Sequence, residues 1–384
     1  MGTKKLFYED CHRQTFTAAV ISCEKTEKGF AVILDETAFY PEGGGQACDV
    51  GTLEDVQVLD VQEAGEDILH FCDGPLIPGQ QVTGRIDYSR RLDLMQQHTG
   101  EHILSGLIHR HFGFHNMGFH VGAACMEVDF DGIIPQEALT QLELEANRAV
   151  WANLPVVCFV PSEEELPGIE YRTKRKLPWP VRIVRIPGVD DCACCGVHTA
   201  FTGEVGLIKI LSCVKFRQGV RLELACGQRA LCYVNQAWEQ NRLVAQQLSV
   251  KQHQTAEAVK RLEAQLGEEK LRSAQLQRQL FDAVAEGYAK KGNVIHWQNG
   301  LSGGELRQLA EKIAARCGGT AVVLSAAEEK TGVCIACPGG DVSAMGKALC
   351  DAFAGKGGGR EGFFQGTLVG EEKEIENYLA ALFS

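Results

Sequence analysis

The stretch DYSRRLDLMQQHTGEHILSGLIHRHFG, residues 87–113, predicts one long helix that carries two histidines on the same face. Asp87 can cap its first turn, and Gly113 is placed to end it. His98 and His102 stand four residues apart, a spacing that brings side chains to one side of a helix. Both imidazoles can therefore reach a single metal ion.

A second pair of metal-binding residue types lies in DDCACCGVH, residues 190–198, where Cys194 and His198 again stand four apart. Gly196 between them allows a tight backbone. Two soft or borderline ligands from each of two segments complete a tetrahedral set that suits zinc. We therefore predict one Zn²⁺ per chain, held by His98, His102, Cys194 and His198.

Two alternatives bear on this metal site. Cys192 and Cys195 lie close enough to compete with Cys194, so the choice of cysteine stays open. A metalloprotease motif needs Glu directly after the first histidine, where the carboxylate can act as a base on water. Here Glu101 instead directly precedes the second histidine, so the pattern argues against a protease.

Outward from these motifs, the chain predicts an α+β protein in four parts. Short alternating stretches over residues 1–88 indicate a small β-barrel. Mixed strands and helices over residues 89–227 form an α+β domain around the zinc site. Residues 228–288 contain no proline and read as a long, coiled-coil-like helical segment, with a break near Gly267. A C-terminal α/β globular domain follows over residues 289–384.

Composition limits the class of protein. Among 384 residues, no apolar run approaches the roughly 20 needed to span a membrane. The first residues carry no apolar signal segment, and the 16 cysteines are scattered along a large chain, so we expect a cytoplasmic protein with reduced thiols.

Charge points to a partner held at one surface. The net charge of −12 argues against a non-specific nucleic-acid binder. One run is nevertheless strongly basic and contains Arg172, Lys174, Arg175, Lys176, Arg182 and Arg185. The glycine-rich stretch at residues 355–359, which includes Lys356 and is followed by Arg360, would also let a backbone approach a phosphate closely. A folded RNA fits this pattern.

Several motifs together resemble a known family. They are FYPEGGGQACDVGTL from Phe39, QQHTGEHILSGL from Gln96, CCGVHTAFTGEVGLIKI from Cys194, GVRLELACGQRAL from Gly219 and GKGGGREGFFQG from Gly355. In this order they resemble free-standing alanyl-tRNA editing proteins of the AlaX family in their long form, and the editing and C-terminal parts of alanyl-tRNA synthetases. The resemblance covers nearly the whole chain.

The resemblance implies hydrolysis of mischarged seryl-tRNA(Ala), and of glycyl-tRNA(Ala), in trans. It assigns zinc to the four residues above, contact with the serine hydroxyl to Thr37, and a place at the editing pocket to Gln46. Val197 stands where the family has threonine, which removes a hydroxyl. The C-terminal half is expected to hold tRNA and to form a homodimer. Editing of seryl-tRNA(Thr), or a non-catalytic RNA-binding module with zinc, remain alternatives.

Overall fold

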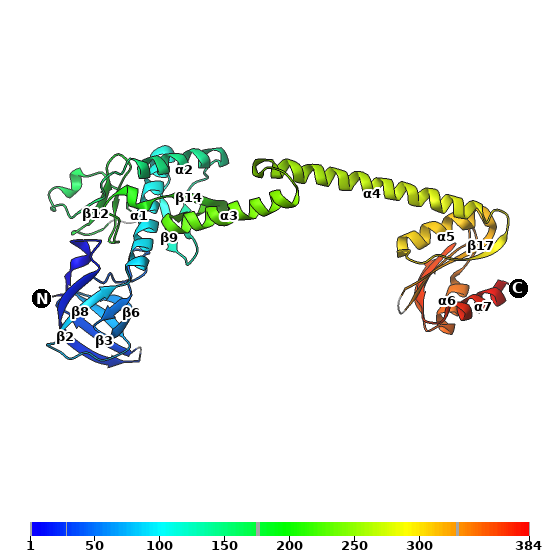
Figure 1. The fold of residues 1–384 in the computed structure, drawn as a ribbon, viewed down its shortest axis with the longest axis horizontal. Helices are drawn as coiled ribbons and strands as arrows, with labels where there is room; N and C mark the ends of the chain where they lie inside the picture. The colour runs from blue at the N-terminus through cyan, green and yellow to red at the C-terminus, as the bar shows by residue number, and fades with distance from the viewer. Residues whose placement is uncertain (1, 28, 174–176, 328–329, 384) are drawn as a thin grey trace. The chain divides into compact units, whose positions relative to one another are not determined.

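The computed structural model describes residues 2–27, 29–173, 177–327 and 330–383. The chain forms two compact units, Met1–Leu243 and Val244–Ser384 (Figure 1). Both mix helices and sheets, so the α+β prediction is confirmed at the level of fold class. Within the described residues, none of the helices is both long and apolar enough to cross a membrane.

The first unit begins with a six-stranded antiparallel sheet that closes into a barrel. In barrel order its strands are β2 (Thr15–Thr26), β3 (Gly29–Leu34), β7 (Asp67–Cys72), β6 (Val56–Ala64), β5 (Gly51–Leu53) and β8 (Gln81–Ile86). Burial alternates along β7, because successive side chains of a strand point to opposite faces. Two short strands, β1 (Lys4–Lys5) and β4 (Glu36–Thr37), pair beside the barrel, and a 3₁₀ turn, η1 (Leu6–Tyr8), follows β1.

Helix α1 (Tyr88–Phe112) follows the barrel directly and agrees with the predicted helix. The Asp87 side chain accepts a hydrogen bond from the Arg90 backbone N–H, which caps the first turn. Gly113 ends the helix in the left-handed region, with φ of 71°. Most of the middle of α1 is buried, so this helix forms the centre of the unit rather than its surface.

Two further sheets and a helix surround α1. A four-stranded sheet runs in the order β14 (Ile208–Phe216), β15 (Gly219–Cys226), β10 (Met126–Phe130) and β9 (Asn116–Val121). A three-stranded sheet contains β11 (Val157–Phe159), β12 (Ile183–Ile186) and β13 (Asp190–Ala193). Helix α2 (Gln136–Trp151) packs with α1 over the larger sheet in one apolar core. Short 3₁₀ turns lie at η2 (Leu166–Gly168) and η3 (Thr202–Val205).

The predicted helical segment consists of α3 (Gly227–Gln247) and α4 (Thr255–Glu286), joined through η4 (Gln252–Gln254). The predicted break near Gly267 is wrong, because α4 continues through that glycine. A helix-interior glycine costs only about 1 kcal/mol, which a helix this long tolerates. The chain turns instead at Ser249, whose φ is 52°.

The second unit contains a five-stranded sheet in the order β16 (Gly292–Trp297), β17 (Gly318–Ala326), β18 (Thr331–Ala336), β20 (Phe363–Leu368) and β19 (Lys356–Arg360). Helix α5 (Gly303–Cys317) and the end of α4 cover one face, while α6 (Ser343–Ala352) and α7 (Glu372–Phe383) cover the other (Figure 1). The apolar residues 321–324 are buried in the middle of β17. The glycine-rich stretch forms β19, the exposed edge strand. The domain limits at residues 88, 227 and 288 stay predictions.

Candidate metal centre

Helix α1 holds His98 and His102 in the interior of the first unit, where each is only 2% exposed. Two glycines of the same helix let neighbouring segments approach closely. A Cβ at Gly100 would lie 2.2 Å from Cys226 Sγ, and one at Gly106 would lie 2.6 Å from the Cβ of Asp190. Small residues at these positions therefore let the end of β15 and the start of β13 pack against the histidine-bearing helix.

The loop after β13 supplies the other two donors, Cys194 and His198. Gly196 presses against the first histidine of α1, since a Cβ there would lie 2.2 Å from His98 Cε1. Arg182 fixes the loop by donating to the carbonyls of Cys194 and Gly196 at 2.8 and 3.0 Å. One donor atom from each of His98, His102, Cys194 and His198 lies within 4.8 Å of the others, so the four predicted ligands form a possible metal site.

Each of the three imidazoles is anchored through Nδ1. His98 Nδ1 donates to Gln46 Oε1 at 2.8 Å, and His102 Nδ1 donates to Asp190 Oδ2 at 3.0 Å. His198 Nδ1 lies 3.3 Å from the hydroxyl oxygen of Thr99. Metal-binding histidines are commonly oriented in this way by a partner on the nitrogen that does not bind the ion.

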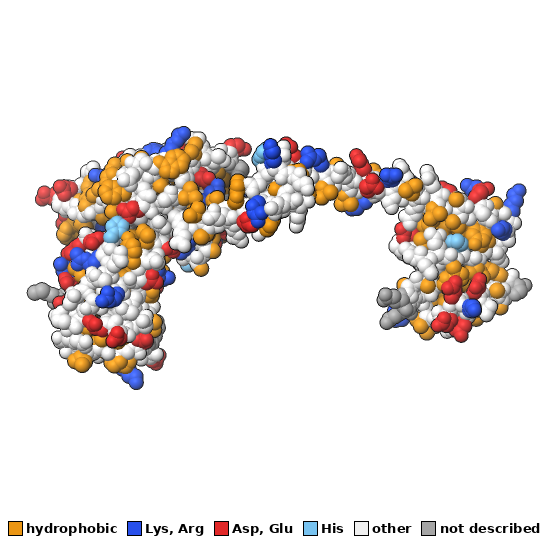
Figure 2. Space-filling view, viewed as in Figure 1, with side chains coloured by type: hydrophobic (Ala, Val, Ile, Leu, Met, Phe, Trp, Pro, Cys, Tyr) orange, Lys and Arg blue, Asp and Glu red, His pale blue; other side chains and the backbone are white. Residues whose placement is uncertain are grey.

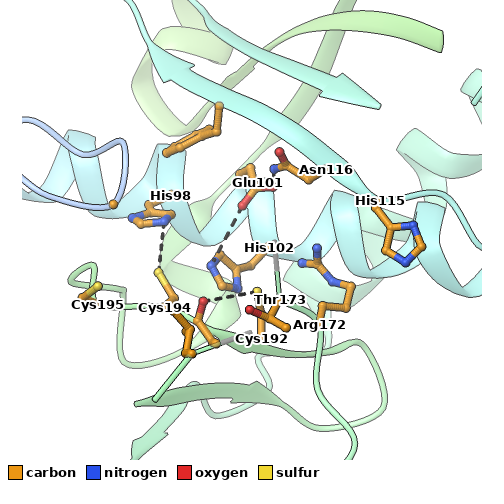
Figure 3. Close-up of a pocket in the computed structure, with 14 residues that line it drawn as sticks. His98, Glu101, His102, His115, Asn116, Arg172, Thr173, Cys192, Cys194 and Cys195 are labelled. Atoms are coloured by element: carbon orange, nitrogen blue, oxygen red, sulfur yellow. Dashed lines mark hydrogen bonds and ion pairs between the residues drawn. The ribbon is translucent and has the colours of Figure 1, made fainter. Parts of the chain in front are cut away.

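The Nε2 atoms are left for a metal. His198 Nε2 is buried and has no hydrogen-bond partner among the described residues, and His98 Nε2 lies 3.4 Å from Cys194 Sγ (Figure 3). Burial and the two neighbouring imidazoles hold the pKa of His198 well below its usual range, which keeps the neutral form that binds metals. This donor set, three imidazoles and one sulfur, fits a metal ion.

The geometry favours Cys194 over its neighbours as the sulfur ligand. Burial alone would raise the pKa of the Cys194 thiol, but the surrounding histidines hold that pKa well below the usual range, which favours the thiolate. Burial raises the pKa of Cys192 to about 11, although this thiol also lies near His102 and Asp190. Cys195 is exposed and does not belong to the four-residue group.

Gln46 lies beside the candidate metal ligands, but its side chain binds other protein groups and does not face the cavity. It is 1% exposed, and its Oε1 accepts from both His98 Nδ1 and the backbone N–H of Val197, the latter at 3.2 Å. It does not line the cavity described below. The Val197 side chain packs with Phe7, Tyr40 and Met95, which explains why an apolar residue fits there.

Thr37 lies in the barrel interior, fully buried, and does not line the cavity either. Its hydroxyl is 2.8 Å from His70 Nε2 and also accepts the backbone N–H of Phe39. Burial lowers the pKa of His70 to about 4, and His70 Nδ1 donates to the Val32 carbonyl, so Nε2 accepts from Thr37. The predicted contact with a substrate hydroxyl stays a prediction that this arrangement does not support.

Sequence reasoning missed the polar groups that support the site. Arg172 makes a two-point ion pair with Asp190, the carboxylate that orients His102. Two arginines of the basic run also have partners within the protein. Arg182 donates to the backbone of the Cys194 loop, and Arg185 forms an ion pair with Asp191. Lys174, Arg175 and Lys176 lie outside the described residues. The positions of these residues along the chain do not indicate which of them pair in the folded protein.

A cavity of about 240 Å³ opens beside the metal centre (Figure 3). It is lined by three of the four candidate ligands, His98, His102 and Cys194, together with one acidic residue, one arginine and an aromatic ring that stacks on His98. These last three are Glu101, Arg172 and Phe119. A small substrate in this cavity would therefore lie next to three of the candidate metal ligands.

Three family profiles match separate parts of this chain. They are the tRNA synthetases class II (A) over residues 3–90, the threonyl and alanyl tRNA synthetase second additional domain over residues 181–222, and the DHHA1 domain over residues 290–384. The second match includes Cys194 and His198. Two of the three profiles are named for tRNA synthetases, so the chain belongs to a class of proteins that combine synthetase-type domains with a candidate metal centre.

The relatives narrow this class. The alanyl-tRNA editing protein Aarsd1 of Mus musculus is 30% identical over 97% of this chain and 95% of its own length. Aarsd1-B of Xenopus laevis is 29% identical over 98% of this chain and 97% of its own. The alanine–tRNA ligase of Pyrobaculum neutrophilum is 33% identical over 97% of this chain, which spans 44% of the ligase. The chain belongs to the alanyl-tRNA editing protein family.

Proposed function

We propose that this chain is an aminoacyl-tRNA deacylase that removes serine, and also glycine, from mischarged tRNA(Ala) in the cytoplasm. A synthetase site built for alanine rejects serine and glycine poorly, because one hydroxyl or methyl group changes binding by only about 1–3 kcal/mol. A second, hydrolytic site corrects such errors. The relatives named as alanyl-tRNA editing proteins support alanine tRNA over threonine tRNA as the substrate.

We also propose that the metal is zinc, one ion per chain, held by His98, His102, Cys194 and His198. The observation that carries this assignment is the shared orientation of the three imidazoles, whose Nδ1 atoms are anchored while Nε2 and a sulfur converge. Three nitrogens and one thiolate suit zinc. When bound, zinc supplies a positive charge that stabilises the negative charge developing on the ester.

The reaction is hydrolysis of the ester between the amino acid and the terminal ribose. The water oxygen bonds to the carbonyl carbon, the bond from that carbon to the ribose oxygen breaks, and a proton from the water passes to the released ribose oxygen, which becomes a hydroxyl. The chain's own contribution is to hold the charged end of the tRNA in the cavity beside His98, His102 and Cys194. Gln46, Asp190 and Thr99 keep the three histidines fixed during the reaction.

The C-terminal half is proposed to hold tRNA and to form a homodimer. Helix α4 exposes an apolar stripe at the spacing of a coiled coil, and these side chains are 40–57% exposed: Val259, Leu262, Leu266, Leu276 and Leu280. In Figure 2, apolar side chains appear between charged ones along this helix. A second copy of α4 would cover the stripe. Strand β19 offers Lys356 and Arg360 on an exposed edge for tRNA phosphates.

One experiment tests the deacylase proposal. Seryl-, glycyl- and alanyl-tRNA(Ala), together with seryl-tRNA(Thr), are incubated with the purified protein before and after chelator treatment. We expect release of serine and glycine from tRNA(Ala), intact alanyl-tRNA(Ala), and loss of release when the metal is removed. Equal hydrolysis of seryl-tRNA(Thr) would refute specificity for alanine tRNA. If none of the substrates is hydrolysed, the deacylase proposal is wrong and the chain is instead a non-catalytic RNA-binding module.

A further inference from the structure

Glu101 is a buried carboxylate at the cavity that the metal centre does not use. It is 4% exposed, and it is not among the four residues whose donor atoms converge. Its Oε1 accepts from Ser105 Oγ and from Asn116 Nδ2, both at 2.5 Å. Its Oε2 has no hydrogen-bond donor among the described residues, and His102 Nε2 lies 3.9 Å away (Figure 3).

The charges that line the cavity indicate what kind of group Glu101 Oε2 can bind. Glu101 is the only acidic side chain among the described residues that line the cavity, whereas the guanidinium of Arg172 is already paired with Asp190. Burying a carboxylate is unfavourable unless its oxygens find partners. Asn116 Oδ1, beside it, is a second buried acceptor without a partner among the described residues. Two acceptors of this kind call for a cationic donor with several N–H groups.

The proposed substrate carries such a donor. Every aminoacyl ester has an α-ammonium group, bonded to the carbon next to the carbonyl that water attacks, and this cation would otherwise approach a positively charged metal centre. We infer that Glu101 Oε2 binds the α-ammonium group of the aminoacyl ester, while Ser105 and Asn116 hold the carboxylate in place. This inference rests on the proposed function. It makes Glu101 a substrate-binding residue that positions the carbonyl beside the metal.

A single change of substrate tests the inference. Nitrous acid converts seryl-tRNA(Ala) into glyceryl-tRNA(Ala), in which a hydroxyl replaces the α-amino group and the ester is unchanged. Glu101→Gln keeps the size of the side chain and removes its charge. We expect kcat/KM for seryl-tRNA(Ala) to fall about ten- to hundredfold, as for loss of a charged hydrogen bond, while hydrolysis of glyceryl-tRNA(Ala) changes by less than about twofold.

The opposite result would identify a different role. Should Glu101→Gln slow both substrates equally, the carboxylate acts on water or on the ester itself, and the inference is wrong. Loss of zinc from Glu101→Gln, measured by elemental analysis, would also overturn it. Ser105→Ala, which removes one donor from Oε1, should weaken the preference for the amino substrate in the same direction but less. Glu137→Gln, an equal change on the exposed first turn of α2, is the control.

A binding measurement separates this inference from the proposed function. A non-hydrolysable analogue, adenosine with serine joined to its 3′ position through an amide, is titrated into wild-type protein and Glu101→Gln. Wild type should bind it more tightly than the deaminated analogue, and Glu101→Gln should bind both alike. If wild type hydrolyses neither tRNA but keeps this binding preference, the proposed function fails and the ammonium site stands. An equal affinity of wild type for the two analogues would refute the site.

Discussion

Replacement of Gln46 by leucine tests whether this amide supports the metal or touches the substrate. The change keeps the volume and removes Oε1, the acceptor for His98 Nδ1 and for the backbone N–H of Val197. Loss of an outer partner of a metal-binding histidine lowers metal affinity about 10- to 100-fold. At about 1.4 kcal/mol per tenfold, the expected loss of zinc-binding free energy is about 1.4–2.8 kcal/mol.

The assay is a competition titration with a chromophoric chelator, followed by deacylation of seryl-tRNA(Ala) at saturating zinc. Gln46→Leu should bind zinc more weakly but recover much of its activity when zinc is saturating. Gln46→Glu keeps an acceptor for both N–H groups, so its zinc affinity should lie near that of wild type. Gln57→Leu makes the same change on the exposed face of β6 and should have no effect.

This reasoning would be refuted if the substitution affected deacylation but not zinc affinity. If Gln46→Leu binds zinc within about twofold of wild type, a difference of about 0.4 kcal/mol, but loses deacylation even at saturating zinc, the outer-partner role is wrong. Gln46 would then act on the substrate, as the family resemblance implies. A fall in both zinc affinity and activity that excess zinc cannot reverse would point to a collapsed site, which circular dichroism would detect.

Four other predictions follow from the structure. Cys194→Ser should abolish zinc binding in elemental analysis while Cys195→Ser retains it, and the reverse pattern would show the ligand assignment to be wrong. Asp49→Ala should lower the free energy of unfolding by about 3–5 kcal/mol in urea titrations, because it leaves a fully buried arginine without its ion pair. Thr37→Val should reduce stability by about 1–3 kcal/mol with equal effects on serine and glycine release; a selective, roughly tenfold loss of serine release would instead support the hydroxyl contact. Leu262→Glu should convert a dimer to a monomer in analytical ultracentrifugation, and an unchanged mass would remove α4 as the dimer contact.

The four residues that form the candidate metal site could be grouped from the sequence because each pair stands four residues apart. His98 and His102 share a helix face whose ends, Asp87 and Gly113, also carry clear local signals. Local signals failed where the competing energies are small. Gly267 predicted a break, yet one glycine costs little within a long helix, and the actual turn uses a left-handed Ser249 that no propensity indicates.

The groups that orient the ligands could not be predicted, because their pairings depend on the folded arrangement of distant segments. Asp190 is 88 positions from the histidine that it binds, and Gln46 is 52 positions from His98. Neither residue type has a preferred spacing from a metal-binding histidine. The resemblance assigns Gln46 to the editing pocket, which stays a prediction, whereas the contacts show that its oxygen faces His98 and a backbone N–H rather than the cavity.

These contacts also explain why the barrel and the ligand-bearing region form one compact unit. All four candidate ligands come from residues 89–227, so the ligands by themselves would place the metal centre entirely within that region. Two barrel-side groups nevertheless reach it: Gln46 joins His98 to Val197, and the Tyr8 hydroxyl donates to the Cys195 carbonyl at 2.7 Å. Because these hydrogen bonds form only when both regions are folded together, the orientation of the candidate metal ligands depends on the barrel. The candidate metal centre therefore depends on both regions, because residues on the barrel side fix its ligand-bearing segments.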